Sequence, residues 1–265
     1  MSVDTRPGYA HAPAVPVTWL VPHGPSAVQA KPLERLGAVT ATLLALTATL
    51  GLLSSASAGW SVLAKAEVSP LPGTTLLAPG TGVPWAALGP VALTALTGIC
   101  LMTWLFRATS NLPLYGVRPR RGPGWAIGAW FVPVISLWWP KQMVDDVVCG
   151  SRPDIRAVVD IRCLSRSAVV TAWWTTWLLA GACAGAGAGV VAFEIFRLQI
   201  LLPNAELESR LAMLDIARLQ ETQAMWTMWA GAASSLSACF AILIVARATG
   251  DQRRRRREVR EQVEL

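Results

Sequence analysis

Residues able to carry acid–base, nucleophilic or metal chemistry are few in this sequence, and their spacing does not suit such chemistry. Both histidines, His11 and His23, lie in a stretch rich in proline and alanine that offers no element to position an imidazole. The adjacent carboxylates Asp145 and Asp146 would point about 100° apart on a helix, so they do not form an acid–base pair. The five cysteines lack metal-ligand or disulfide-framework spacing. We therefore expect no catalytic residue, no metal and no cofactor, and a protein that is not an enzyme.

The densest pattern of distinctive residues lies between positions 104 and 146. It contains nineteen uncharged residues, 122–140, with arginines before them and a lysine after them. Arg107 and Asn111 lie four residues apart and share one helix face. We expect them to hydrogen-bond the carbonyls that a break at Pro133 leaves free, or to pair with the two aspartates. A pocket for a lipid or small ligand beside this stretch is the alternative.

The composition of the chain indicates a membrane protein. Hydrophobic residues make up 53% of the 265 residues and charged residues only 15%, whereas soluble domains carry about 25% charged residues. The thirteen tryptophans fit helix ends anchored at a membrane interface. The surplus of 23 basic over 16 acidic residues is typical of loops that face anionic lipid. We therefore expect membrane lipids as partners of the protein, and we expect no binding of nucleic acid.

Four long uncharged runs predict transmembrane helices. A helix needs about 20 apolar residues to cross a bilayer, and lipid-exposed strands are stable only in closed barrels. The predicted fold is therefore all-α, a four-helix transmembrane bundle occupying a membrane domain at residues 33–248. The predicted spans are 36–64, 84–106, 167–193 and 222–246.

The distribution of positive charge predicts the orientation of these spans. With four spans, 19 of the 23 Lys and Arg residues fall on the side that carries both termini. A fifth span at 122–140 would divide them 10 to 13. Since cytoplasmic loops carry the excess of positive charge, we expect four spans in the cell membrane with both termini in the cytoplasm.

The stretch at 122–140 must then enter and leave from the cytoplasmic side. Pro133 removes a backbone donor and disfavours helical geometry before it. This predicts a re-entrant or interfacial helical segment whose bend is buried against other helices. A short fifth span is the alternative.

Two further segments carry helix-packing signals. Gly181, Gly185 and Gly189 form a GxxxGxxxG row in the third span, which favours close approach of another helix. That helix is either the second or fourth span of the same chain or a second copy in a homo-oligomer. Residues 204–223 predict an amphipathic helix that runs towards the fourth span.

The two ends of the chain predict tails outside the membrane domain. Residues 1–32 carry prolines throughout, which predicts a disordered cytoplasmic tail. Residues 249–265 predict a basic cytoplasmic tail. Its five arginines are expected to contact anionic lipid or an acidic partner, or to serve only as a topological anchor. They are Arg253, Arg254, Arg255, Arg256 and Arg257.

The motif residues resemble a family of bacterial multi-pass membrane proteins catalogued as domain of unknown function 4328. The resemblance extends from about the second span to the fourth and implies a membrane fold without implying an activity. It does not extend to the proline-rich start or to the run of arginines. The residues that carry it are Trp104, Arg107, Ala108, Asn111, Gly116, Gly124, Trp125, Gly128, Trp130, Phe131, Pro133, Pro140, Gln142 and Asp146.

Taken together, these patterns favour a non-enzymatic protein of the cell membrane. A scaffold, a sensor or a lipid-interacting module fits the basic face and the interfacial tryptophans. A small channel or carrier that uses residues 122–140 as a pore or gate element is the alternative. An ionisable residue inside a span would favour a carrier, and the four predicted spans have none.

Overall fold

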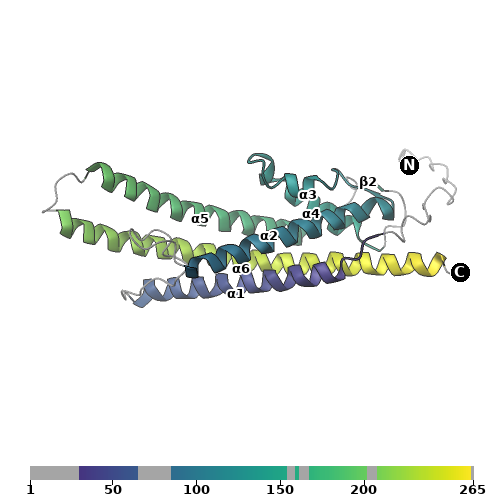
Figure 1. Cartoon of the computed structure of the whole chain (residues 1–265), viewed down its shortest axis with the longest axis horizontal. Helices are drawn as coiled ribbons and strands as arrows, with labels where there is room; N and C mark the ends of the chain where they lie inside the picture. Colours follow the sequence, from purple (N-terminus) through teal and green to yellow (C-terminus); the bar gives the residue numbers. More distant parts are fainter. Residues whose placement is uncertain (1–29, 65–84, 154–158, 161–166, 202–207, 264–265) are drawn as a thin grey trace, which may run out of the picture.

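Four long helices dominate the computed structural model of the chain, which describes residues 30–64, 85–153, 159–160, 167–201 and 208–263. Each helix is long and apolar enough to cross a membrane. The prediction of an all-α fold with four membrane helices is confirmed. The helices are α1 (Glu34–Ala64), α2 (Trp85–Asn111), α5 (Ala168–Leu201) and α6 (Glu208–Val263), shown in Figure 1.

Short elements connect α2 to α5. The first, η3, is capped by Gly116, whose φ of 77° is the left-handed conformation that glycine adopts without strain. Two strands of two residues each pair in parallel, with Val117 opposite Val159. Within the described residues this ladder is the one piece of β-structure. The elements are η3 (Leu112–Tyr115), β1 (Val117–Arg118), α3 (Trp125–Gly128), η4 (Ile135–Leu137), α4 (Trp139–Gly150) and β2 (Val159–Asp160).

The helix α6 organises the bundle, because α1 and α5 both pack along it while α2 packs on α1 (Figure 1). Small residues bring α1 and α6 into close contact. A Cβ atom at Gly231 would lie 2.6 Å from a carbonyl oxygen of α1. The Ser235 hydroxyl donates to the Ala48 carbonyl at 2.9 Å, and the Ser55 hydroxyl donates to the Met228 carbonyl at 2.8 Å. These hydrogen bonds fix the register of the two antiparallel helices.

The buried core is concentrated at the end of the bundle where α1 begins and α2 ends. There α4 contacts α2, α5 and α6. The largest fully buried side chains at this end include Trp104, Leu112, Met143 and Val147. Along the rest of their length the helices turn large apolar side chains outward, as helices surrounded by lipid do.

Residues 122–140, the Trp hairpin, return to the place where they leave the bundle. The stretch holds only short helical turns, and its two ends meet. The Trp125 and Trp139 rings lie 4.7 Å apart edge to face, and the Arg121 guanidinium lies 3.8 Å from the centroid of the Trp139 ring. Arg121 also donates to the Gln142 side chain. The stretch therefore contains no fifth helix long enough to cross a membrane, and its re-entrant or interfacial position stays a prediction.

The bend of the Trp hairpin is exposed, so the prediction of a buried bend was wrong. Pro133 itself is exposed. The reason is local, because the Ser136 hydroxyl donates to the Pro133 carbonyl at 2.8 Å. Near the bend, Trp174 of α5 donates to the Leu137 carbonyl at 3.0 Å. These two carbonyls therefore have partners although the bend is exposed, and neither Arg107 nor Asn111 donates to them.

The GxxxGxxxG row of α5 does not pack against any of the described helices, so the interpretation of packing against the second or fourth span was wrong. A Cβ atom at Gly181, Gly185 or Gly189 would meet nothing within 4 Å. The close contact with α6 is made instead by Gly187, where a Cβ would lie 2.9 Å from the Cβ of Trp226. The row faces outward, and its role in a homo-oligomer stays a prediction.

The predicted N-terminal tail and amphipathic helix fall partly outside the described residues. Part of the predicted amphipathic helix, residues 204–207, and nearly all of the predicted N-terminal tail lie outside the described residues. From Glu208 onward the chain runs directly into the fourth span, as α6. The helix α6 continues unbroken to Val263, so the arginine run lies on the same helix as the fourth span. The end of the membrane domain near residue 249 stays a prediction.

Candidate functional site: a polar hub at the end of the bundle

Asn111, at the last turn of α2, clamps the backbone of the segment that precedes α1. Its side chain is 1% exposed. The amide oxygen accepts the Lys31 N–H at 3.0 Å, and the amide nitrogen donates to the Lys31 carbonyl at 3.0 Å. The same nitrogen donates to the Gln252 side chain at 2.9 Å. Asn111 therefore holds the segment that precedes α1 against α2 and α6.

Gln252 of α6 continues this network towards α4. Its amide nitrogen donates to the Ala108 carbonyl at 3.2 Å and to the Ser151 hydroxyl at 2.9 Å. Its backbone carbonyl accepts a hydrogen bond from the Tyr115 hydroxyl at 3.4 Å. Because a buried amide without partners is costly, the satisfied Gln252 fixes α6 against α2, η3 and α4 in one arrangement.

Arg255, in the middle of the arginine run, points into the protein. It is 8% exposed, and its guanidinium donates to the Gly150 carbonyl at 2.8 Å and the Tyr115 carbonyl at 3.2 Å. These carbonyls end α4 and η3, where a positive charge is favoured. Together Asn111, Tyr115, Ser151, Gln252 and Arg255 form what we call the polar hub.

The rest of the arginine run divides into one paired residue and three exposed ones. Arg256 forms an ion pair with Glu34 at 2.7 Å, which joins α6 to the first turn of α1. Arg253, Arg254 and Arg257 are exposed. The prediction of five equivalent lipid contacts was therefore wrong for Arg255, whose guanidinium is used inside the fold.

Asp145 and Asp146 hold α4 to its neighbours on two sides. Asp146 accepts the Arg120 backbone N–H at 3.0 Å and lies 3.2 Å from the Arg120 side-chain Nε. Asp145 accepts the Ser167 backbone N–H at 3.3 Å, just before α5 begins. Burial raises the pKa of Asp146 to about 6, and the hydrogen bond and charge of Arg120 offset part of that rise. The two carboxylates diverge, as the sequence predicts.

The aromatic residues of the motif divide between the core and the Trp hairpin. Trp104 is fully buried and donates to the Thr249 hydroxyl at 3.1 Å. Trp130 lies edge to face against Trp177, with ring centroids 5.6 Å apart, and against Trp174 at 6.2 Å. Pro140 is buried in the first turn of α4. The motif thus couples the end of α2 to the Trp hairpin and α5.

Arg107 does not join the other motif residues. Its side chain is exposed at the end of α2, and none of the hydrogen bonds or ion pairs seen among the described residues involves it. The predicted interaction of Arg107 with the Pro133 bend or with the aspartates was therefore wrong. Sharing a helix face with Asn111 does not give Arg107 the same surroundings, because the last turn of α2 lies at the edge of the core.

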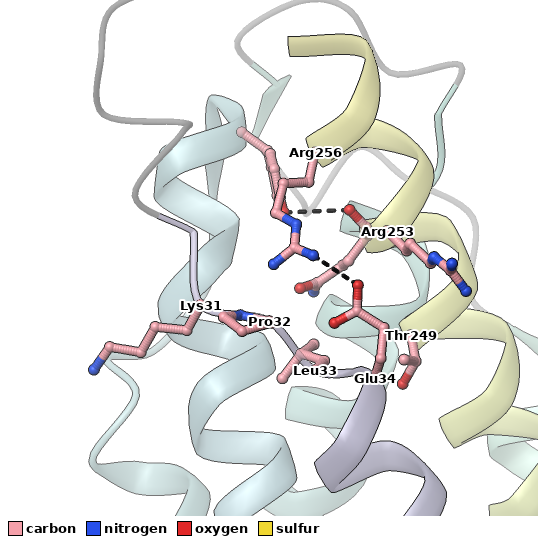
Figure 2. Close-up of a pocket in the computed structure, with 9 residues that line it drawn as sticks. Lys31, Pro32, Leu33, Glu34, Thr249, Arg253 and Arg256 are labelled. Carbon is pink, nitrogen blue, oxygen red and sulfur yellow. Dashed lines mark hydrogen bonds and ion pairs between the residues drawn. The ribbon is translucent and has the colours of Figure 1, made fainter. Parts of the chain in front are cut away.

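A small pocket lies beside the polar hub, between the start of α1 and the end of α6 (Figure 2). Its room of about 10 Å³ fits one water molecule and no larger ligand. In Figure 2 the Arg256 guanidinium reaches across it to Glu34. No cluster of three potential metal ligands occurs among the described residues. The arrangement is suited to holding helices in place.

Several residues of the polar hub were not found by sequence reasoning. Gln252 and Arg255 follow Val245 and Ala248 on one face of α6, at intervals of three or four residues. That continuing helical period is the signal that would have identified them. It was hidden because Arg255 has an arginine on either side.

Comparison with known proteins agrees with the motif and with the range that it covers. No curated protein and no solved structure matches the chain. A family model described as Domain of unknown function (DUF4328) matches residues 81–250, which includes Asn111, Asp146 and the Trp hairpin but excludes α1 and the arginine run. Because the match covers more than half of its length, the chain belongs to the DUF4328 family.

Proposed function

We propose that the protein is a non-enzymatic, lipid-interacting module of the cell membrane, with both termini in the cytoplasm. In this proposal the Trp hairpin lies in the headgroup region of the cytoplasmic leaflet with its bend among the acyl chains. The observation that supports this proposal most is that the two ends of the Trp hairpin lie together while large apolar side chains stay exposed at its bend. The four membrane helices supply the frame in which this element is held.

The exposed surface of the Trp hairpin supports contact with lipid. Phe131 is 72% exposed, Val134 is 64% exposed and Leu137 is 51% exposed, although all three are large apolar residues. In water such a patch would be costly, because burying apolar surface gains about 25 cal/mol per Å². An interfacial element recovers this free energy by inserting its apolar side into the leaflet.

The base of the Trp hairpin carries groups suited to the membrane interface. Arg121 stacks on Trp139, a cation–π pair with an apolar body and a charged tip. Lys141 lies in the first turn of α4, with its Nζ 3.9 Å from the Asp145 carboxylate. Tryptophan and basic residues both favour the headgroup level. The element is thus apolar at its bend and basic at its base, as an element lying in one leaflet should be.

The depth of the bend tests this proposal. A nitroxide spin label would be attached at Phe131→Cys in a variant without the native cysteines, reconstituted in vesicles of phosphatidylcholine and phosphatidylglycerol. Arg118→Cys, also exposed but on β1, is the matched control. We expect oxygen to relax the label at 131 and a water-soluble nickel chelate to relax the label at 118. A label at 131 that the nickel chelate reaches as readily as the label at 118 would overturn the proposal.

A further inference from the structure

Three helices carry an outward apolar stripe that ends in an exposed arginine. On α1 the stripe consists of Val39, Leu46 and Leu53, and it leads to Arg35. These residues repeat at intervals of four or seven, which keeps them on one helix face.

The same arrangement occurs on two more helices. On α2 the exposed Leu96 and Ile99 lead to Arg107, and on α6 the exposed Leu236 and Leu243 lead to Arg247. Each arginine therefore stands where a surface suited to acyl chains stops.

Contacts between the helices place the three arginines at one level. The Thr47 and Thr97 hydroxyls are 3.1 Å apart, and from there Arg35 is about 18 Å along α1 and Arg107 about 15 Å along α2. The hydrogen bond between Ser235 and Ala48 sets the level of α6 in the same way. From that contact Arg247 is about 18 Å along α6, and Arg35 is about 20 Å along α1.

The distances of the three arginines from these contacts agree to within one helical turn. We propose that Arg35, Arg107 and Arg247, the arginine belt, bind the phosphate groups of anionic phospholipids around this end of the bundle. A guanidinium donates two parallel hydrogen bonds to a phosphate, which makes arginine well suited to this contact.

The surroundings of the belt favour anionic lipid over zwitterionic lipid. Arg253, Arg254 and Arg257 are exposed farther along the same end of α6, so the local field is positive. Arg255 and Arg256 differ from the belt, since their guanidinium groups are held by carbonyls and by Glu34. The inference rests on the proposed function in that both place this end of the bundle at a leaflet surface.

Lipid selectivity measured with spin-labelled lipids tests the belt. The protein is reconstituted in phosphatidylcholine, and the association constant of spin-labelled phosphatidylglycerol is measured relative to spin-labelled phosphatidylcholine. We expect Arg35→Gln, Arg107→Gln and Arg247→Gln combined to lower this ratio towards one, with up to about fivefold lost per site, since a basic residue near the surface contributes about 1 kcal/mol. The side chains are exposed, so the fold should persist.

The control removes the same charge from the same end of the molecule. Arg254, Arg257 and Arg260, exposed farther along α6, would each be replaced by Gln. This variant should lose only the part of the selectivity that the more distant positive field supplies, which is clearly less than the belt variant loses. Lys at the three belt positions should keep most of the selectivity. An equal loss in the control and belt variants would overturn the belt, because net charge would then explain the selectivity.

The two proposals fail in different ways. A water-exposed label at position 131 together with selectivity that depends on the belt would contradict the proposed function and support the belt. A buried label together with selectivity that is unchanged in the belt variant would contradict the belt alone.

Discussion

At the scale of single residues, Asn111 shows how one side chain can join three segments of a membrane protein. Its amide matches the N–H and the carbonyl of Lys31 as a neighbouring strand would, and also reaches Gln252. The motif spacing predicts that Asn111 has a fixed partner, but spacing alone does not say which partner. The partners lie 80 and 141 residues away in sequence, and only the packing of α1 and α6 on α2 brings them together.

Asp146 predicts a pH dependence of stability. Its pKa in the folded protein is about 6, above the ordinary value of 3.8, mainly because burial disfavours the charge. The folded state therefore holds this proton more tightly than the unfolded state, so the contribution to stability is present at low pH and is lost as the pH rises from about 4 to about 6.

The Asp146→Asn variant isolates this effect from other titrating groups. The free energy of unfolding of the unmodified protein, relative to that of the variant, should fall by roughly 2 kcal/mol between about pH 4 and pH 7. Chemical unfolding in detergent at several pH values measures both proteins. A difference that stays constant with pH would contradict a raised pKa at Asp146.

At the scale of elements, α6 extends from the membrane into the polar hub without a break. Its 56 residues would span about 84 Å, far more than a bilayer needs. The sequence predicts the apolar part of this helix well, because a run without charge is a direct signal. It does not predict the role of the charged part, since the solvent-facing and buried arginines have the same chemistry and differ only in helical phase.

Arg254 and Arg255 offer a test of that difference, because neighbouring arginines face opposite environments. Arg255→Ala leaves the Gly150 and Tyr115 carbonyls without a donor, so we expect a loss of about 2–4 kcal/mol in the free energy of unfolding. Arg254 is exposed, and its replacement by Ala should change stability by no more than about 0.5 kcal/mol. Equal effects of the two substitutions would contradict the inward position of Arg255.

The glycines of α5 provide a second test at this scale. Gly187→Ala places a methyl group 2.9 Å from the Cβ of Trp226, so overpacking of about 1–3 kcal/mol should outweigh the gain in helix propensity. At Gly185 the space is open, so Ala should stabilise α5 by up to about 1 kcal/mol. Thermal unfolding of both variants measures the difference in sign. Destabilisation by Gly185→Ala would mean that another helix, such as that of a second copy, occupies the open face.

At the scale of the whole molecule, the sequence predicts the frame better than it predicts the site. Long uncharged runs correctly predict four membrane helices, and the placement of charge correctly predicts that residues 122–140 do not span. Both signals come from residues that meet lipid or water directly. The polar hub depends on side chains from distant segments, and the exposed bend of the Trp hairpin depends on the short-range hydrogen bond of Ser136. Such contacts form only when the helices are in place.

The orientation of this frame is the last prediction. The start of α1 and the end of α6 lie at one end of the molecule (Figure 1), and 19 of the 23 Lys and Arg residues belong to that side of the predicted topology. Cytoplasmic loops carry such an excess because positive residues resist transfer across the membrane. Leu63 lies at the opposite end, and its side chain is 82% exposed. The Leu63→Cys variant should therefore react with a membrane-impermeant maleimide in intact cells.

Arg254→Cys should react with the same reagent only after the membrane is permeabilised. Both variants would be made in a background without the native cysteines, and labelling of both after permeabilisation shows that each thiol is accessible. Reaction at position 254 in intact cells would reverse the orientation. It would also place the Trp hairpin and the arginine belt in the outer leaflet, because the polar hub ties both to the end of α6.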